Sequence, residues 1–305
     1  MAIQPVSLRL SEARLPEFAD ALGASFERYG FAIVEDHGID PGLIDRALAD
    51  AKTFFALPEA AKRRYVVPGA ASQRGYTPFG VEAAKGAEHA DLKAFWHVGR
   101  EPDPAGRGLK NVWPEEAPGF RASVGGLYDA FDALGGKLLA ALAVHLGLEP
   151  NHFDAAIAGG DSILRLLHYP PVAGAGPAIR AGAHEDINAI TLLLGAEEAG
   201  LELLDRDRRW LAVNPEPGAV VVNVGDMLQR LTNHRLPSTT HRVVNPAPER
   251  RGVARYSMPF FLHFHPDYTI ETLPGCVTAD TPDRHPHPIT ARDYLNERLR
   301  EIRLA

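Results

Sequence analysis

The chain has 305 residues, of which 45% are hydrophobic, and a formal net charge of −7. This hydrophobic content is enough to bury a sizeable core, in one large domain or in two. The acidic balance and the lack of any segment dense in lysine and arginine argue against nucleic acid or an anionic membrane surface as the main partner. We therefore expect a small-molecule ligand.

The cysteine count and the apolar runs bear on the cellular compartment. The one cysteine, Cys276, excludes an internal disulfide framework. The start, MAIQPVSLRLSEARLPE, lacks the apolar stretch of a signal peptide, and no run approaches the length of a membrane span. We expect a cytoplasmic protein with no membrane partner, and the oligomeric state is left open.

The first elements follow a mostly helical pattern. Ser11 is a candidate N-cap for a helix whose apolar face reaches Tyr29. A buried strand, GFAIVED, is predicted over residues 30–36, and an amphipathic helix follows from about 41 to 57.

The next segment, residues 66–120, is rich in glycine and proline, which favours irregular loops at the edge of a ligand site. A long helix is predicted from about 118 to 147, because leucine and phenylalanine recur there at spacings of three and four. We interpret this half of the chain as scaffold.

From residue 161 the hydrophobic pattern becomes that of short strands separated by turn residues. The runs are SILRLLHY, AITLLL, LELLD, RWLAV, AVVVNV, THRVV and RYSMPFFLHF. Seven or eight strands at this spacing favour a sandwich or a jelly-roll barrel. The tail is predicted to end in a helix, because Thr290 and Asp293 have the spacing of a capping box.

One His-x-Asp pair, His184 and Asp186 in AGAHEDINAITLLL, stands at the start of an apolar run. On an extended strand residues i and i+2 point to the same face, so this imidazole and carboxylate can converge. His241, 55 residues after Asp186 and in another β-like run, is a candidate third ligand. Two histidines and one carboxylate are the ligand set of non-haem Fe(II) oxygenases.

A second set with similar spacing consists of His89, Asp91 and His145. We do not favour it, because EHADLK shows no strand alternation and His145 stands in the predicted long helix. The first set also has a companion motif. Arg255 and Ser257 form another i, i+2 pair, in which a guanidinium and a hydroxyl can bind the far carboxylate of a dicarboxylate co-substrate.

These motifs together resemble the Fe(II)- and 2-oxoglutarate-dependent dioxygenases, and within them the isopenicillin N synthase-like branch. In the second half the resemblance rests on the HED motif with a later histidine, on RYS, on LRLLHYPP and on VNVGDMLQRLTNHRLPSTTHRVVNP. In the first half it rests on ERYGFAIVEDHGI, GYTPFGVEAAKG and DLKAFWHVG. It covers nearly the whole chain.

The resemblance implies an α+β fold with a double-stranded β-helix (jelly-roll) core flanked by N-terminal helices and a C-terminal helix. It implies that Fe(II) is bound by the HED…H residues and that 2-oxoglutarate is anchored by Arg255 and Ser257, with Tyr169 beside it. Decarboxylation of 2-oxoglutarate to succinate would then be coupled, with O2, to C–H oxidation of a small-molecule substrate, most often by hydroxylation. Leu167 departs from the pattern, because many members carry asparagine there.

The resemblance also suggests a division of the chain. We predict an N-terminal dioxygenase region at 1–120, a connecting helix at 121–158, the jelly-roll core at 159–266 and a tail with a helix at 267–305, all in one compact unit.

Several further residues are candidates for the pocket, although strand alternation would equally make each of them part of the core. The candidates for the co-substrate pocket are Asn223, Thr191 and Leu193. The candidates for the substrate cavity are Tyr76, Phe79, Phe95 and Trp96.

Alternatives remain at every level. His184 and Asp186 could be a hydrogen-bonded pair at a strand end, Arg255 could form an ion pair at the barrel mouth, and Tyr169 could serve packing alone. The enzyme could be an iron oxidase of the same fold that uses no 2-oxoglutarate, in which case no succinate appears. A third reading is a non-catalytic module that binds a metal or a carboxylate.

Overall fold

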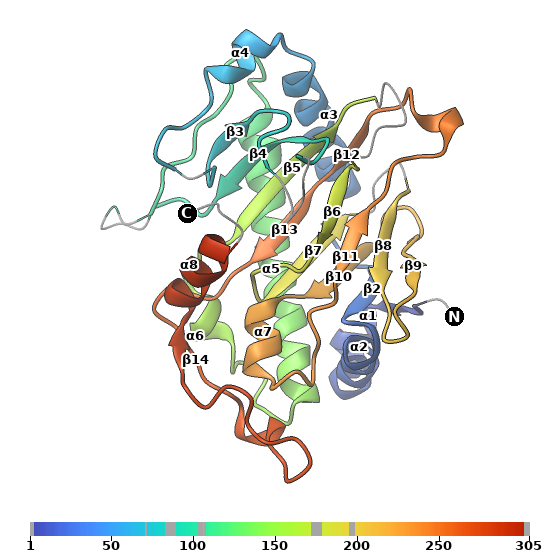
Figure 1. Cartoon of the computed structure of the whole chain (residues 1–305), viewed down its shortest axis with the longest axis vertical. Helices are drawn as coiled ribbons and strands as arrows, with labels where there is room; N and C mark the ends of the chain where they lie inside the picture. Colours follow the sequence, from blue (N-terminus) through green and yellow to red (C-terminus); the bar gives the residue numbers. More distant parts are fainter. Residues whose placement is uncertain are drawn as a thin grey trace.

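The structure is a computed structural model, which describes residues 3–70, 72–82, 90–102, 106, 108–171, 179–194 and 199–301. A large sheet and a small sheet face each other, and helices cover the outer side of the large sheet (Figure 1). The predicted α+β fold with a jelly-roll core is confirmed. Among the described residues, no helix combines the length and apolar character needed to cross a membrane.

Among the described residues, four helices precede the long helix α5, and the two longest of them pack against it. The four helices are α1 (Arg9–Ala13), α2 (Leu15–Tyr29), α3 (Pro41–Phe55) and α4 (Glu59–Arg63). Ser11 does not cap the main helix as predicted, since it lies within α1 and its hydroxyl donates to the Leu8 carbonyl. α2 begins instead at a proline-containing first turn, where a missing N–H costs nothing.

The predicted long helix is confirmed as α5 (Phe120–His145), which packs against α2, α3 and the large sheet. It buries a broad stripe of leucine and phenylalanine. The short helix α6 (Asp154–Ile157) follows α5 and leads into the first strand of the second half. The face of the large sheet that this layer of helices covers is largely apolar.

The large sheet has nine strands, in the order β1-β2-β10-β7-β13-β5-β4-β3 with β12 also paired to β5. All pairs are antiparallel except β1 with β2. The strands are β1 (Pro5–Ser7), β2 (Phe31–Glu35), β3 (Gly75–Thr77), β4 (Ala94–Gly99), β5 (Ile163–Tyr169), β7 (Ile190–Leu194), β10 (Val220–Val224), β12 (Arg255–Ser257) and β13 (Pro259–Leu262).

The small sheet has the order β6-β11-β8-β9 and lies across the barrel interior from β2 and β10. Its strands are β6 (Ala181–His184), β11 (His241–Val243), β8 (Leu201–Leu204) and β9 (Trp210–Ala212). Alternation along β10 explains the contact between the sheets, because Val221 joins the apolar cluster between them while Val220 and Val222 face the helices.

Two short strands, β14 (Thr269–Ile270) and β15 (Ile289–Thr290), pair in the tail, and helix α7 (Asp226–Leu231) follows β10. The tail ends in α8 (Ala291–Glu301), and the predicted cap is confirmed. The Thr290 hydroxyl donates to the Asp293 carboxylate at 2.8 Å and accepts from the Asp293 N–H at 3.1 Å. Two 3-10 turns lie at Pro248–Arg250 and Pro274–Cys276.

The prediction of loops throughout residues 66–120 is wrong in part, because β3 and β4 lie there. Every residue of β4 is buried, and β4 pairs with β5 along its whole length. Glycine and proline on both sides of this strand hid it, although the run AFWHVG is itself rich in β-forming residues. N-terminal strands therefore lie at both edges of the large sheet (Figure 1), and the division into four segments stays a prediction.

Candidate active site

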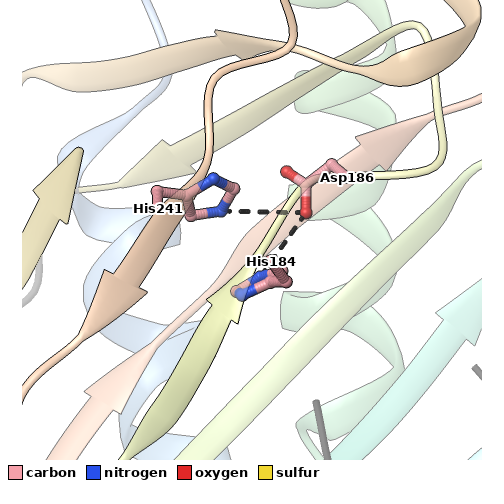
Figure 2. Close-up of side chains that lie close together, drawn as sticks. All are labelled: His184, Asp186 and His241. Carbon is pink, nitrogen blue, oxygen red and sulfur yellow. Dashed lines mark ion pairs between the residues drawn. The ribbon is translucent and has the colours of Figure 1, made fainter. Parts of the chain in front are cut away.

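His184 and His241 lie opposite each other on the neighbouring strands β6 and β11. Their ring centroids are 4.4 Å apart. Asp186 is not on the strand, as the sequence argument assumed, because β6 ends at His184. The chain nevertheless bends so that Asp186 Oδ1 lies 3.8 Å from Nε2 of each histidine (Figure 2).

The three side chains form a set of possible metal ligands. One ligand atom from each lies within 4.8 Å of the others, and no other such group of three occurs among the described residues. Asp186 and His241 are buried, while His184 keeps part of its surface open to a cavity. Two nitrogens and one carboxylate oxygen at this separation match the donor set that the sequence predicts.

Backbone carbonyls orient both imidazoles. His184 Nδ1 lies 2.7 Å from the Gly182 carbonyl and His241 Nδ1 lies 3.1 Å from the Thr239 carbonyl. Because a carbonyl only accepts, each Nδ1 carries the hydrogen and each Nε2 presents a lone pair to the centre of the site. Desolvation, reinforced by the neighbouring His241, lowers the pKa of His184 to about 4, so the ring is neutral and able to bind a metal.

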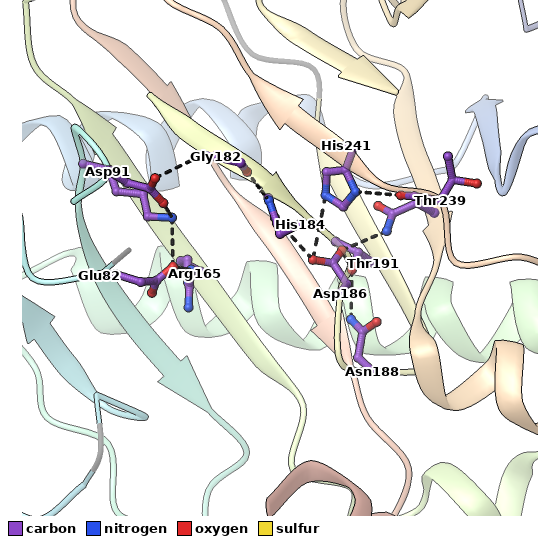
Figure 3. A network of polar contacts seen from close by, with 12 residues as sticks. Glu82, Asp91, Arg165, Gly182, His184, Asp186, Asn188, Thr191, Thr239 and His241 are labelled. Carbon is purple, nitrogen blue, oxygen red and sulfur yellow. Dashed lines mark hydrogen bonds and ion pairs between the residues drawn. The ribbon is translucent and has the colours of Figure 1, made fainter. Parts of the chain in front are cut away.

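Asp186 is held by two hydrogen bonds to its other oxygen. Oδ2 accepts from the Thr191 hydroxyl at 2.5 Å and from the Asn223 amide at 2.8 Å, and the Asn188 amide in turn donates to Thr191 (Figure 3). Burial would raise the pKa of Asp186, but the histidines and these hydrogen bonds outweigh it and lower the pKa. The carboxylate is therefore ionised and Oδ1 is left for a metal.

Thr191 and Asn223 were candidates for the co-substrate pocket, and the structure places both of them on Asp186 instead. Leu193, further along β7, packs with the apolar cluster between the sheets. Strand alternation identified the interior face of β7 and β10 but not the partner of each side chain.

The predicted anchor residues are brought together by the pairing of β12 with β5. Arg255 lies opposite Tyr169, and Ser257 opposite Leu167. The Arg255 guanidinium donates to the Ser257 hydroxyl at 3.0 Å, and its carbon lies 5.1 Å from the centre of the Tyr169 ring. All of these side chains are buried. Leu167, at the unusual position, packs with Phe95 and Tyr169.

The site opens into a cavity of about 1410 Å³ whose wall includes His184 and Asp186. The four aromatic candidates for this cavity are not among the described residues of its wall. Tyr76 and Trp96 pack in the core around Phe54, Phe95 is buried beside Leu167, and Phe79 is exposed. Each of the four has another environment in this structure, and their role in substrate binding stays a prediction.

Charged residues of the N-terminal half, together with Arg165 of β5, line the cavity, and sequence reasoning missed them. Lys93 Nζ lies 2.8 Å from both Glu82 Oε1 and Asp91 Oδ2, and Arg165 Nη1 lies 3.2 Å from the same Glu82 oxygen. Asp91 accepts from the Gly182 N–H at 3.0 Å, which ties this cluster to the strand that carries His184 (Figure 3). Alternation in DLKAFWHVG and LRLLHY was the signal that could have found them.

The second candidate ligand set is not assembled by the described residues. His89 lies outside them, Asp91 pairs with Lys93, and His145 Nε2 lies 3.0 Å from Glu27 on helix α2.

Comparisons with known proteins identify the family of the chain. The family model described as the 2OG-Fe(II) oxygenase superfamily matches residues 160–264, and the model of the N-terminal region of non-haem dioxygenases in morphine synthesis matches 3–116. A proline hydroxylase of Petromyces alliaceus is 33% identical over 95% of this chain and 95% of its own length.

Two solved structures extend the likeness to the fold. A 2OG-Fe(II) oxygenase family protein from Caulobacter crescentus is 57% identical, with a TM-score of 0.92 over 99% of both chains. A Neurospora crassa protein, crystallised in complex with alpha-KG and thymine, is 29% identical, with a TM-score of 0.87 over 98% of this chain and 96% of that one. The chain thus belongs to the 2OG-Fe(II) oxygenase superfamily, in its isopenicillin N synthase-like branch, and is a dioxygenase that uses Fe(II), 2-oxoglutarate and O2.

Proposed function

We propose that His184, Asp186 and His241 bind the iron of this dioxygenase. The observation that carries this assignment is the convergence of three donor atoms within 4.8 Å, with each Nδ1 turned away to a carbonyl. Three protein ligands leave coordination positions for the co-substrate and O2. When bound, the iron and 2-oxoglutarate supply the oxidising chemistry, in which 2-oxoglutarate becomes succinate and CO2 while a C–H bond is oxidised.

We further propose that Arg255 and Ser257 bind the C5 carboxylate of 2-oxoglutarate, with Tyr169 packed beside it. A buried guanidinium next to a hydroxyl can donate hydrogen bonds to both oxygens of one carboxylate. The apolar Leu167 leaves the polar contacts at this position to Arg255 and Ser257. Burial of the trio strengthens these interactions, because the local dielectric is low.

The reaction that we propose is hydroxylation of a small molecule. Support comes from the relatives, since one is a proline hydroxylase and another was crystallised with thymine, and both of these compounds are small. The low pKa values of His184 and Asp186 favour a neutral imidazole and an ionised carboxylate, which are the forms that bind a metal.

An anaerobic titration tests the assignment. Adding Fe(II) and then 2-oxoglutarate to the protein should produce the visible charge-transfer band of a chelated co-substrate. We expect no band in Asp186→Ala and a band that needs at least tenfold more 2-oxoglutarate in Arg255→Met. Arg242→Met, on the same strand as His241 but bonded to Glu202, is the matched control. Iron binding without a band in the wild type would favour an oxidase that uses no 2-oxoglutarate.

A further inference from the structure

Arg165 and Glu82 stand together in the wall of the cavity that contains His184 and Asp186. Their side chains are 18% and 17% exposed, so both are largely buried yet open on one side. Arg165 lies on β5, on the same face as Tyr169, four residues away. That spacing corresponds to about 13 Å along the strand, so Arg165 is separate from the proposed carboxylate anchor at Arg255.

The Arg165 guanidinium is fixed from three sides. Its Nε donates to His97 Nε2 at 2.6 Å, and His97 Nδ1 lies 2.5 Å from the Ser72 carbonyl. Burial, together with the charge of Arg165, holds the pKa of His97 well below its usual value, so the ring is neutral and can accept this bond. The rings of Phe95 and Phe261 lie 4.2 and 5.2 Å from the guanidinium carbon. Such a preorganised group loses little freedom when it binds a ligand.

Among the described residues, Nη2 of Arg165 and Oε2 of Glu82 have no partner, and we take both as available to a ligand. Both cations that contact Glu82 approach Oε1, and no described residue bonds to Glu82 Oε2 or to Arg165 Nη2. Other polar side-chain atoms of the protein are fully buried and lack a partner, but these two atoms are not among them. Because Nη1 of Arg165 contacts Glu82 Oε1, these two side chains adjoin each other in the cavity wall, one with an N–H group and the other with a carboxylate oxygen to offer.

The local charge favours a neutral ligand over an anion. Glu82, Asp91, Lys93 and Arg165 form one contact network with two carboxylates and two cations. Contact with the two cations lowers the pKa of Glu82 despite its burial, and the two carboxylates raise the pKa of Lys93 despite its burial. Glu82 therefore stays ionised and Lys93 stays protonated at neutral pH. A carboxylate placed here would be uncompensated and would lie beside Glu82.

We propose that Arg165 and Glu82 bind the primary substrate, and that this substrate is a neutral small molecule with a carbonyl beside an N–H, such as an amide, a lactam or a cyclic imide. Arg165 donates to the carbonyl and Glu82 accepts from the N–H. This inference rests on the proposed function of the cavity as the active site. It makes both side chains specificity-determining residues, with His97 as a positioning residue behind Arg165.

Ligand-observed NMR on the protein loaded with Zn(II) and 2-oxoglutarate tests the inference without turnover. The probes are benzamide and benzoate, which have the same shape and differ in charge. We expect benzamide to bind at least tenfold more tightly. Arg165→Lys should weaken benzamide about tenfold, because the ammonium lacks the planar fork. Glu82→Gln, which keeps the size and shape of the side chain, should reverse the preference in favour of benzoate.

Arg292→Met is the control, because Arg292 also lines the cavity but is exposed and paired with Asp267. Its affinity for benzamide should change less than twofold. Tighter binding of benzoate by the wild type, or unchanged preference in Glu82→Gln, would overturn the inference. The charge-transfer titration on the same variants separates the two proposals, because a wild type that binds no 2-oxoglutarate contradicts the proposed function itself.

Discussion

Asp186 is the proposed metal ligand whose geometry depends on the largest number of neighbours. One of its oxygens is taken by Thr191 and Asn223, and only the other points to the histidines. These hydrogen bonds keep the carboxylate from rotating and from taking up a proton. We therefore expect Thr191 and Asn223 to affect the affinity for iron without touching the metal.

Replacing Thr191 by valine keeps the shape of the side chain and removes the hydroxyl. We expect Fe(II) to bind 10- to 100-fold more weakly, the usual effect of losing such a partner. Anaerobic titration gives the affinity. The control is Thr272→Val, which removes a comparable hydroxyl-to-carboxylate bond, to Asp283, on the surface. Equal affinities in wild type and Thr191→Val would show that Asn223 alone suffices.

A second residue-scale prediction concerns the pH dependence of stability. Partial burial would raise the pKa of Glu27, but contacts with Arg235 at 2.7 Å and His145 at 3.0 Å outweigh it and lower the pKa. A lowered pKa means that the stabilisation is present above the unfolded value of about 4.5 and is lost as the pH falls through the folded value.

Glu27→Gln should therefore lower the free energy of unfolding at pH 7, by up to about 1 kcal/mol for so exposed a group. The difference from wild type should shrink as the pH falls below about 4.5. Urea unfolding at a series of pH values measures it, with Glu17→Gln, from an exposed pair with Arg14, as the control. A difference that stays constant with pH would contradict this account.

At this scale the sequence predicted residue types better than contacts. The HED motif and His241 could be predicted because a metal site needs a rare set of ligands at a spacing that strands supply. The partner of Thr191 could not be predicted, because alternation shows which face of the sheet a side chain occupies but not which residue it contacts. Arg165 was missed because a lone arginine in an apolar strand shows no partner until β4 is paired with β5.

Among the elements, the junction of β10 and α7 packs closely against the loop after β6, which carries Asp186 and Asn188. Gly225 stands between β10 and α7 in VNVGDM, and a Cβ there would collide with the Asn188 backbone carbonyl. Its φ of −102° suits any residue, so the requirement for glycine is steric. Asn188 also supports Thr191, which connects this junction to Asp186.

We expect Gly225→Ala to destabilise the protein by about 1–3 kcal/mol, as overpacking usually does. Because the Asn188 backbone has to move, the affinity for Fe(II) should fall as well. Urea unfolding and metal titration measure the two effects. Gly252→Ala is the control, since a Cβ there meets nothing within 4 Å. Loss of stability with unchanged metal affinity would show that the loop moves independently of Asp186.

The elements themselves were mostly predictable where a hydrophobic period was long or uninterrupted. α5 and β5 follow their patterns closely. β6 was harder, because AGAH is short, small and partly exposed, and nothing in those residues alone demands a strand. Its conformation comes from pairing with β11, a contact between residues far apart in the chain.

On the scale of the whole molecule, metal binding should stabilise the entire fold. The two histidines among the proposed ligands lie on two strands of the small sheet, which shares an apolar layer with the large one, and Asp186 follows the first of these strands. At a metal concentration 100-fold above the dissociation constant, binding adds about 2.7 kcal/mol to the free energy of unfolding. Mn(II), which suits the same ligands, should give this gain in the wild type.

In Asp186→Ala, Mn(II) should no longer increase the free energy of unfolding. Urea unfolding with and without Mn(II) measures it, followed both by circular dichroism and by tryptophan fluorescence, because Trp96 lies in the large sheet and Trp210 in the small one. The two signals should shift together. A shift in fluorescence alone would show that the sheets unfold separately.

The position of β2 in the large sheet has a consequence for synthesis on the ribosome. β2 ends at Glu35, yet its antiparallel partner β10 is complete only at Val224. At about 5–20 residues per second, roughly 10 to 40 seconds of translation separate the two strands. During that time the apolar segment FAIV has left the tunnel without the neighbour that buries it, so the nascent chain offers a binding site for chaperones until the barrel can close.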